Sequence, residues 1–346
     1  MTQAVIVGVG ARSPLGLTAT QTAFSLRVGL PAMREAPLVD SEGERITMCF
    51  LPTIDPHLTG PARGFELAHP ALAEALRPIS NLKSLPLRVR LALAVDEYVD
   101  AMTAASLANR LDDPIKPIAT EFELTISTRG PAGGAYLLQE ILEAFAANRI
   151  DMAVLGGVHT DYDPTRIAQL DRAKRLFCPP ADLTAVLPGE AAAFVMLVQP
   201  LLARRMGWEV FGGIVGVATG FEQARPDNDA SAFRATGLTA AMRTVLAPLD
   251  DQKQRAGWVL SDLGFEPYRH FEQQAALTRT QRWFCEPQQL DNPGQRMGNL
   301  GAAAVPLHLA IACKGFEHGC APHHVVLSTA GSDNGERAAT VIVRAS

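Results

Sequence analysis

The sequence has little of several features that would mark particular protein classes. It holds five cysteines, no Cys-x-x-Cys pair, and a formal net charge of −5. These values exclude a disulfide-rich secreted domain and a broad basic face for nucleic acid or anionic membranes. No run approaches the ~20 apolar residues that span a bilayer, and the first residues lack the basic stretch of a signal peptide. We therefore expect a cytoplasmic protein with reduced thiols.

The remaining composition is that of an ordinary globular protein. The chain has 346 residues, of which 47% are hydrophobic and 19% charged. This length is sufficient for two core-bearing units. Short β-branched runs alternate with stretches of helical periodicity, which predicts an α/β fold. We divide the chain into an N-terminal half, residues 1–205, and a C-terminal half, residues 206–346.

Both halves repeat one plan of strands and helices. In the first half we predict strands at residues 4–9, 122–127, 152–157 and after the turn at 188–190, helices at 18–28, 86–107 and 133–149, and an irregular insertion at 33–70 with a candidate hairpin at 45–50. In the second half we predict strands at 210–219, 258–260, 324–329 and 340–343, and helices at 269–283 and 300–314. Each half is too small and too apolar to stand alone. Packed together, they would form a layered domain with buried sheets.

The segment most informative about function is residues 123–136, ELTISTRGPAGGAY. It predicts a strand that runs through a sharp turn into a long helix. Its Ile-Ser-Thr-x-x-x-x-Gly frame resembles the nucleophile turn of β-ketoacyl synthases, in which a cysteine lies three residues after the serine. In this sequence the corresponding residue is Gly130, which has no side chain to acylate.

Four further segments resemble β-ketoacyl synthases and occur in the same order. They are residues 6–16 (IVGVGARSPLG), 151–158 (DMAVLGGV), 187–197 (LPGEAAAFVML) and 298–307 (GNLGAAAVPL). The resemblance covers nearly the whole chain in pieces and is to a divergent member of the thiolase superfamily. It implies a thiolase-like fold, with two halves related by a pseudo-twofold axis in five layers, α/β/α/β/α.

The resemblance also locates three catalytic positions. In that family the cysteine lies at a helix N-terminus, where the dipole lowers the thiol pKa and backbone amides form an oxyanion hole. Gly130 takes the cysteine position, Asp262 takes a histidine position, and Asn299 takes a third position that is His or Asn. An aspartate cannot donate to a thioester carbonyl at neutral pH, and the family's glycine-phenylalanine gate is not recognisable in residues 330–335. We therefore expect a vestigial site with no catalytic residue.

Other side chains offer alternatives to this site. Cys178 precedes the Gly-Glu turn and lies away from the predicted helix N-terminus, which favours a structural or exposed thiol. His270 is near Asp262 and Glu266 in the sequence, as an acid–base group would be, but its Gln-rich helix favours a surface position. Residues 159–163 (HTDYD) place two carboxylates after a strand, where α/β sites lie but where loops are polar in any case.

Metal and nucleotide sites have weaker support. His318, His323 and His324 lie near Cys320, but their spacing matches no standard zinc pattern. Gly8-x-Gly lacks the later glycine of a dinucleotide fingerprint and is better interpreted as a strand end. We expect neither a metal nor a cofactor.

The leading functional hypothesis is a non-catalytic synthase-like protein that acts as a partner, scaffold or accessory factor. Chain-length-factor subunits of polyketide systems have lost the nucleophile of this fold and persist as half of a heterodimer, so the resemblance implies a homodimer or a heterodimer with a related protein. Residues 261–269 (SDLGFEPYR) resemble a branch encoded beside type VI secretion effectors and their adaptors. A secretion effector or adaptor is therefore a candidate partner.

Two alternatives stay open. The first is an acyltransferase or synthase acting on acyl-CoA or an acyl carrier protein, in which Asn299 and the helix start at residues 130–133 polarise a thioester without a covalent step. The second is a binding module for an acyl thioester. Bulky side chains filling the space beside Gly130 and Asn299 would exclude an acyl chain and favour the leading hypothesis.

Overall fold

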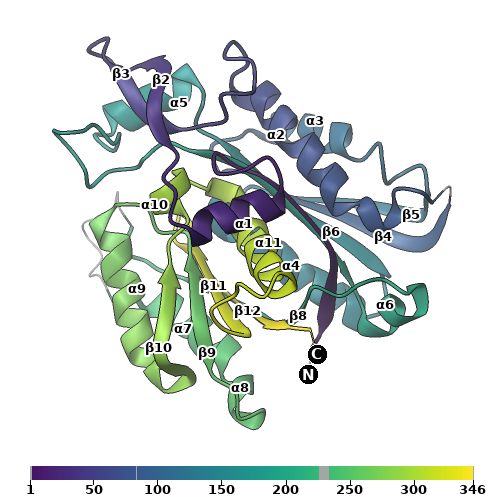
Figure 1. Cartoon of the computed structure of the whole chain (residues 1–346). Coiled ribbons are helices and arrows are strands. Elements are labelled where there is room, and N and C mark those ends of the chain that lie inside the picture. Colours follow the sequence, from purple (N-terminus) through teal and green to yellow (C-terminus); the bar gives the residue numbers. More distant parts are fainter. Residues whose placement is uncertain (1, 83, 226–233, 346) are drawn as a thin grey trace.

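The computed structural model describes residues 2–82, 84–225 and 234–345. Within these ranges one large sheet has the strand order β10-β9-β11-β12-β8-β1-β7-β6-β4-β5, and β2 and β3 form a separate hairpin (Figure 1). The strands are β1 (Ala4–Arg12), β2 (Met33–Val39), β3 (Arg45–Cys49), β4 (Leu85–Ala94), β5 (Ala119–Ser127), β6 (Met152–Thr160), β7 (Glu190–Val198), β8 (Gly212–Phe221), β9 (Ala256–Ser261), β10 (Phe284–Asp291), β11 (Val325–Gly331) and β12 (Glu336–Arg344).

The large sheet consists of two halves with the same topology. The first half has the order β5-β4-β6-β7-β1 and the second has β10-β9-β11-β12-β8. In each half three parallel strands are followed by two antiparallel pairings. β1 and β8 pair antiparallel and join the halves. This arrangement confirms the predicted pseudo-twofold plan, whereas the boundary near residue 205 stays a prediction.

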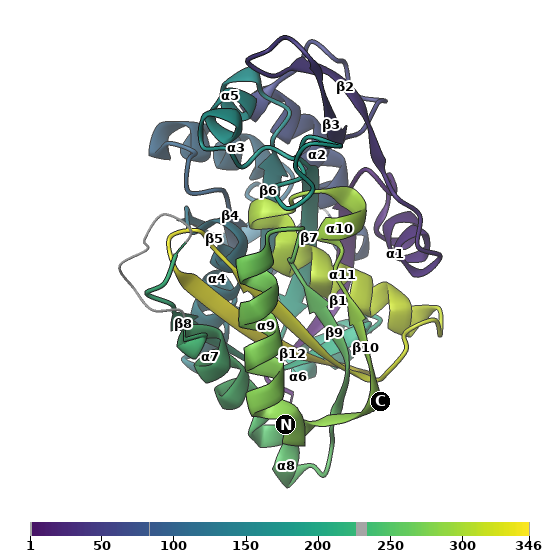
Figure 2. The ribbon, with the colours of Figure 1, turned by 90° about the vertical axis from the view of Figure 1, so that its left-hand side faces the viewer.

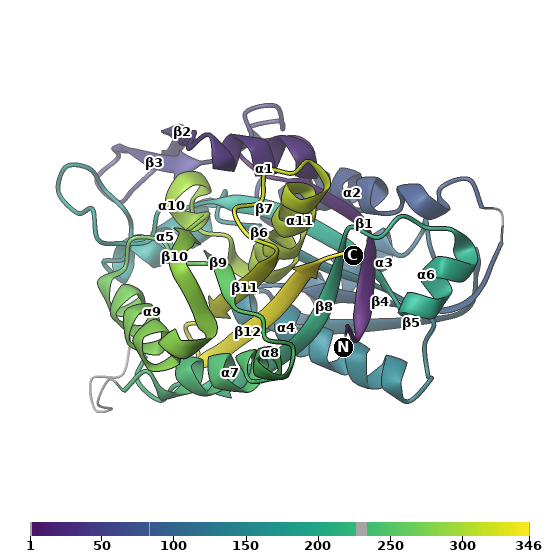
Figure 3. The same cartoon turned by 60° about the horizontal axis from the view of Figure 1, so that its bottom comes forward.

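The helices form three layers around the sheet. α4 and α11 lie together in the central layer and contact strands of both halves, α2 and α3 cover the outside of the first half, and α7 and α9 cover the outside of the second (Figures 1 and 2). Figure 3 shows the same layers from below. The helices are α1 (Ala19–Arg27), α2 (Gly60–Ala75), α3 (Ala101–Leu111), α4 (Gly130–Ala146), α5 (Pro164–Arg172), α6 (Pro200–Met206), α7 (Thr236–Leu246), α8 (Pro248–Asp251), α9 (Pro267–Thr280), α10 (Gly294–Met297) and α11 (Ala304–Glu317), with short 3-10 turns η1 (Arg77–Ile79), η2 (Gln281–Trp283) and η3 (Gly301–Ala303).

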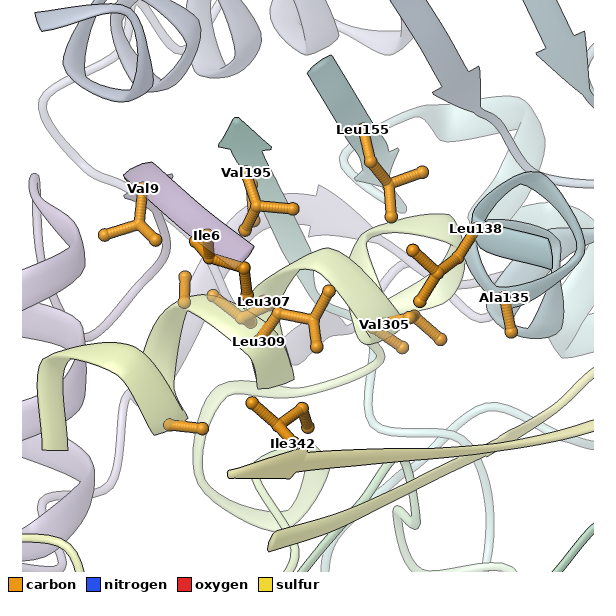
Figure 4. Packing of buried hydrophobic residues seen from close by; sticks show 14 of the residues in the cluster. Ile6, Val9, Ala135, Leu138, Leu155, Val195, Val305, Leu307, Leu309 and Ile342 are labelled. Carbon is orange, nitrogen blue, oxygen red and sulfur yellow. The ribbon is translucent and has the colours of Figure 1, made fainter. Parts of the chain in front are cut away.

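The central helices supply much of the apolar core. Leu138 of α4 and Val305 and Leu307 of α11 are buried in one cluster with Ile6 of β1 and Val195 of β7 (Figure 4). Full burial of each such aliphatic side chain contributes about 1.5–3 kcal/mol. This packing holds the starts of α4 and α11 in place. Within the described residues, no helix is both long and apolar enough to cross a bilayer.

Two glycines of β1 allow α2 to pack closely on the strand. A Cβ atom on Gly8 would lie 2.1 Å from the carbonyl oxygen of Ala75, and one on Gly10 would lie 2.0 Å from that of Ala71. Only glycine permits such an approach between a helix backbone and a strand. The Gly-x-Gly pattern is thus explained by packing, as expected for a strand end.

The helix predicted at residues 86–107 is wrong except for its last part, residues 101–107. β4 occupies the first part, α3 begins at Ala101, and the two are separated by a polar loop. Val89, Leu91 and Leu93 of β4 lie in one buried cluster and Ala92 and Ala94 lie in another, so both faces of its second part are covered. Leucine and valine alternate with arginine and alanine along residues 87–94, which is the period of a strand, and the helix prediction overlooked it. The error concealed the loop at residues 95–100, which carries the site described below.

The irregular insertion predicted at residues 33–70 is only partly correct. A hairpin is present, but it pairs β2 with β3; residues 45–49, where the whole hairpin was expected, form the single strand β3, and α2 already begins at Gly60. Two prolines in α2 argued against a helix, yet Pro61 lies in the first turn, where proline is tolerated. The buried ion pair between Arg63 and Glu190, with Nε–Oε2 at 2.6 Å, fixes α2 to β7. α7 and β10 were also not predicted.

Candidate functional site

The three positions identified from the sequence lie around one small cavity. Gly130 is the first residue of α4, Asp262 follows β9, and Asn299 precedes η3. Asp262, Asn299, Glu97 and Pro131, the neighbour of Gly130, line a cavity of about 80 Å³. That volume holds a few water molecules and lies well below the ~300–1,000 Å³ of typical ligand sites.

The conformation of Gly130 favours glycine, and a carboxyl group lies in the space beside it. Its φ angle is +55°, a left-handed value that other residues adopt at a cost. A Cβ atom built there would lie 1.9 Å from Oε2 of Glu97. The Glu97 carboxyl group therefore fills the space that a side chain at position 130 would occupy.

The backbone amides at the start of α4 are already engaged. The N–H of Gly130 donates to the carbonyl oxygen of Val95 at 3.2 Å, and Pro131 has no N–H. The N–H of Ala132 donates to Oγ of Ser332 at 3.1 Å, and that hydroxyl donates to the carbonyl oxygen of Arg129. Ser332 belongs to residues 330–335, where the family gate was expected. These bonds engage two of the donors that an oxyanion hole at this helix start would use, the N–H groups of Gly130 and Ala132.

Glu97 has no hydrogen bond or ion pair with another described residue. Burial of its carboxyl group, together with the nearby charges of Asp96 and Asp333, raises the pKa of Glu97 to about 7. A hydrogen bond from the backbone N–H of Glu97 itself and the charge of Arg166 oppose this shift only in part. Near neutral pH the cavity thus contains a carboxyl group that is about half protonated.

Asp262 is bound by its surroundings rather than directed freely into the cavity. Its Oδ1 accepts from Arg269 at 3.0 Å, and its Oδ2 accepts from the N–H of Gly331 at 2.8 Å. Arg269 also donates to the carbonyl oxygen of Gly331. Burial raises the pKa of Asp262, and the Arg269 charge opposes that rise. Asp262 therefore joins the end of β9 to α9 and β11.

Asn299 belongs to a second, buried polar network. Its Nδ2 donates to Oδ2 of Asp161 at 3.1 Å, and its Oδ1 accepts from the N–H of Gly301 at 3.1 Å. Asp161 also contacts Nε2 of His159 at 3.0 Å and Nε of Arg166 at 3.1 Å. Of the two carboxylates in residues 159–163, Asp161 is thus internal, whereas the half-buried Asp163 caps the start of α5, where its Oδ1 accepts from the N–H of Thr165.

His159 is held between two carboxylates. Its Nδ1 lies 2.7 Å from Oδ2 of Asp96, opposite the contact of Nε2 with Asp161. Burial alone would lower the pKa of His159, but the two carboxylates outweigh burial and raise it to about 10. Burial would likewise raise the pKa of Asp161, but His159 and Arg166 keep it well below its usual range. His159 is therefore an imidazolium at neutral pH.

Sequence reasoning missed Asp96 and Glu97, which connect the two parts of the site. Both follow β4, at the carboxyl end of a parallel strand, where α/β sites usually form. The usable signal was a pair of acidic residues directly after an apolar run. It was lost because that run was assigned to a helix.

The other candidates lie outside this constellation. Cys178 is a free, exposed thiol in a loop, as expected. His270 makes no hydrogen bond to Asp262 or Glu266; its Nε2 lies 2.9 Å from the carbonyl oxygen of Gly264. Arg175 binds Glu266 instead, at 2.8 Å.

The C-terminal histidines pair with rings rather than with metal-ligand partners. His323 and His324 stack at 4.3 Å between ring centroids, and His318 packs near Phe24 at 5.2 Å. In the parts of the chain that the structure describes, no group of three or more His, Cys, Asp or Glu residues is placed to hold a metal ion.

Comparison by sequence gives no assignment, since no protein-family model and no curated protein matches the chain. Comparison by structure, in contrast, assigns the fold clearly. The ishigamide ketosynthase/chain length factor superposes with a TM-score of 0.82 at 17% identity, covering 99% of both chains. A type II polyketide synthase ketosynthase in complex with its acyl carrier protein (AntDE:AntF) gives 0.81 at 11% identity, again covering 99% of both.

A third neighbour is the ketosynthase from module 6 of the bacillaene synthase of Bacillus subtilis 168. It gives a TM-score of 0.79 at 15% identity and covers 99% of this chain and 72% of that one. Such low identities with near-complete coverage define the architecture. The chain has the thiolase-like fold of ketosynthases, as its motifs predicted.

Proposed function

We propose that this chain is a ketosynthase-fold protein that does not condense acyl groups and instead acts as a partner, scaffold or accessory subunit. One observation carries the proposal. Gly130 stands at the nucleophile position, and the space beside it is taken by the Glu97 carboxyl group, 1.9 Å from where a Cβ atom would lie. Covalent catalysis in this fold needs a thiol at that point.

Three further observations support the same conclusion. The N–H groups of Gly130 and Ala132 are engaged by Val95 and Ser332. Asp262 is bound to Arg269. The cavity of about 80 Å³ is too small for an acyl chain. These features also weigh against non-covalent activation of a thioester, because two N–H groups at the start of α4 are already engaged.

The partner is proposed as a second copy of this chain or a related protein. The structural neighbours include a ketosynthase/chain length factor and a ketosynthase in complex with an acyl carrier protein. The finer proposal of a type VI secretion effector or adaptor rests on residues 261–269 alone. In the structure, Asp262 and Glu266 of that segment are used in ion pairs with Arg269 and Arg175.

The first experiment measures covalent acylation. We expect no mass increase after incubation with acyl-CoA or with acylated acyl carrier protein, measured by intact mass spectrometry. Cys178→Ser is the control for adventitious acylation of the exposed thiol. A stoichiometric thioester on any cysteine of the wild-type chain would contradict the proposal.

The second experiment rebuilds the site stepwise. Gly130→Cys alone should show no condensation, because Asp262 replaces the polarising histidine. Adding Asp262→His is the minimum change for turnover, and adding Glu97→Ala tests whether the neighbouring carboxyl group also hinders the thiol. The measurement is release of free CoA or carrier thiol. Turnover by Gly130→Cys alone would show that the site is far less degenerate than proposed.

The third experiment identifies the partner. Purification of the native protein after mild crosslinking, followed by mass spectrometry and analytical ultracentrifugation, should recover a related subunit or a defined homodimer. A secretion effector or adaptor in stoichiometric amount would support the finer assignment. A chain that stays monomeric and free of partners would contradict the scaffold role.

A second function, the acyl-thioester binding module, has one observation in its favour. A cavity of about 280 Å³ lies beside the site, with Val95, Val99, Leu107 and Val158 in its lining. Isothermal titration with octanoyl-CoA tests this function directly. Val158→Trp should abolish any binding, while CoA without an acyl chain should not bind.

A further inference from the structure

The cavity of about 280 Å³ beside the site carries charged groups for which the uncharged acyl part of a thioester has no use. It lies where α2, α3 and α5 begin next to the end of β6, at the top of Figure 2. Its volume is near the lower end of the range of small-molecule sites. The apolar lining is formed by Val95, Val99, Leu107 and Val158, of which Val99 is half-buried and the others are buried. The cavity therefore suits a small molecule with an aliphatic part.

Arg166 supplies an open cationic group to this cavity. Its Nε donates to Oδ1 of Asp161 at 3.1 Å, and its guanidinium group lies over the ring of Tyr98, 4.2 Å from the ring centroid. The two terminal nitrogens of Arg166 have no acceptor among the residues that the structure describes, and 18% of the side chain is exposed. A guanidinium group with both terminal nitrogens free can bind the two oxygens of one carboxylate.

Asp163 supplies an open anionic group to the same cavity. Its Oδ1 accepts from the N–H of Thr165 at 2.7 Å, as the cap of α5. Its Oδ2 has neither a donor nor an ion pair within the described ranges of the chain. Gly60 leaves this oxygen uncovered, because a Cβ atom built on Gly60 would lie only 2.5 Å from it. One carboxylate oxygen is thus left for an ammonium group.

The two other acidic side chains of the lining are occupied. Oδ2 of Asp96 lies 2.7 Å from Nδ1 of the imidazolium of His159. Asp100 caps α3, where its Oδ1 accepts from two backbone N–H groups of the first turn and its Oδ2 accepts from the hydroxyl group of Thr103 at 2.6 Å. The charged groups of the lining that stay open are therefore one cation and one anion.

We propose that this cavity binds a free α-amino acid with an aliphatic side chain. An α-amino acid carries its carboxylate and its ammonium group on one carbon atom. Asp163 and Arg166 are the N-cap and the third residue of α5, positions whose side chains meet at a helix start. Arg166 binds the carboxylate, Asp163 binds the ammonium group, and the aliphatic side chain packs against the valines and Leu107.

The charge pattern decides against the other ligand classes. A fatty acid leaves the open oxygen of Asp163 without a cation, and an acyl thioester or an internal peptide segment pairs neither charge. A free amino acid pairs both. This ligand goes beyond the proposed scaffold role, and it is an alternative to an acyl thioester in the same cavity.

The first test compares ligands by isothermal titration of the full chain. L-Leucine, L-valine and L-methionine should bind at one site per chain. Leucinamide, which lacks the carboxylate, and isocaproate, which lacks the ammonium group, should bind at least tenfold more weakly than leucine. Absence of binding by all three amino acids at millimolar concentration, or equally tight binding of either analogue, would overturn the proposal. Binding of octanoyl-CoA but not of leucine would overturn it too and would assign the cavity to an acyl thioester.

Two conservative variants test the assigned groups. Arg166→Lys keeps a positive charge beside Asp161 but loses the paired N–H groups, and Asp163→Asn keeps a capping side chain but loses the negative charge. Each should weaken leucine binding at least tenfold. Arg172→Lys on the same helix and Asp113→Asn, both at exposed positions outside the lining, are the matched controls and should bind leucine as the wild type does.

Thermal unfolding of each variant shows whether it is folded. If Arg166→Lys does not fold, Asp163→Asn and the ligand series still decide the question. Unchanged leucine binding in Asp163→Asn, or an equal loss in the two control variants, would overturn the proposal. None of these outcomes depends on the acylation experiments at Gly130.

Discussion

The two central helices begin with the same backbone feature in different surroundings. α4 begins at Gly130 and the η3–α11 segment begins at Gly301, with φ angles of +55° and +44°. A Cβ atom at 130 would lie 1.9 Å from Oε2 of Glu97, and one at 301 would lie 2.4 Å from Oδ1 of Asp96 and 2.1 Å from Nδ1 of His159. The loop after β4 therefore touches both helix starts through adjacent carboxyl groups.

The difference lies in how firmly those groups are held. Asp96 contacts His159 and accepts from the N–H of Ala302 at 2.9 Å, within a buried network. Glu97 has no such partner among the described residues. The start of α11 is thus a rigid polar centre, whereas the start of α4 is filled by a carboxyl group that can move. The position that the resemblance assigns to the nucleophile, Gly130, lies at the loosely held end.

The largest expected effect is at the rigid end. His159→Gln removes the cation between Asp96 and Asp161 and should cost about 3–5 kcal/mol at pH 6, as breaking a buried ion pair does. The folded-state pKa of about 10 is raised above the ordinary value of 6.5. The protonated His159 side chain therefore stabilises the fold fully below pH ~6.5, and this stabilisation is lost as the pH rises through about 10.

Chemical denaturation between pH 5.5 and 10 measures this effect. The variant should be nearly insensitive to pH where the wild type weakens. His57→Gln, at an exposed histidine, is the control and should keep the wild-type profile. An equally steep loss of stability in His159→Gln would remove the ion-pair explanation.

The next largest effect is expected for Gly301→Ala. The left-handed backbone costs about 1–2 kcal/mol, and the new methyl group must displace Asp96 or His159 from hydrogen bonds that cannot be replaced. We expect a total loss of about 2–4 kcal/mol, measured by urea unfolding. A loss no larger than that of Gly130→Ala would show that the two helix starts are equally tolerant.

The sequence predicted much of the fold because the fold repeats. Apolar runs around residues 4–9, 152–157 and 324–329 were assigned as strands, and residues 133–149 as a helix, because each has the period of its element. β4 was not predicted because its alternation of Leu and Val with Arg and Ala over residues 87–94 was merged with the helical residues that begin at Ala101 into one helix. α2 was not predicted because glycines and prolines interrupt its apolar stripe.

Only those site residues that lie in recognisable motifs could be predicted from the sequence. The positions of Gly130, Asp262 and Asn299 came from resemblance, and the structure places Asp262 and Asn299 in one cavity lining beside the start of α4. That Glu97 occupies the nucleophile space could not be inferred, because it depends on a tertiary contact between a loop and a helix start. Propensity and spacing contain no information on such a contact.

A smaller effect is expected for Glu97→Gln at the loosely held end. The pKa of Glu97, about 7, is raised above the ordinary 4.5, so the fold is penalised when the carboxyl group ionises. The wild type should lose stability as the pH rises from ~4.5 through about 7, and the variant should not. Because the group is half-buried, we expect a gain of about 1–3 kcal/mol at pH 8 and none at pH 4. Unfolding curves at both pH values check this, and equal gains at both would point to a cause other than ionisation.

The smallest effect is expected for Gly130→Ala, about 1 kcal/mol of lost stability. The φ angle of +55° imposes the usual left-handed penalty on alanine. The apparent clash with Glu97 should add little, because the far end of a free glutamate side chain can swing aside.

The double variant Gly130→Ala with Glu97→Ala separates the two contributions. If backbone strain dominates, Gly130→Ala lowers the free energy of unfolding by the same amount with and without the Glu97 side chain. If the carboxyl group is held firmly, Gly130→Ala lowers the free energy of unfolding less in the Glu97→Ala background. Coupling above about 1 kcal/mol in this cycle would mean that Glu97 is as fixed as Asp96, and the contrast between the two helix starts would fail.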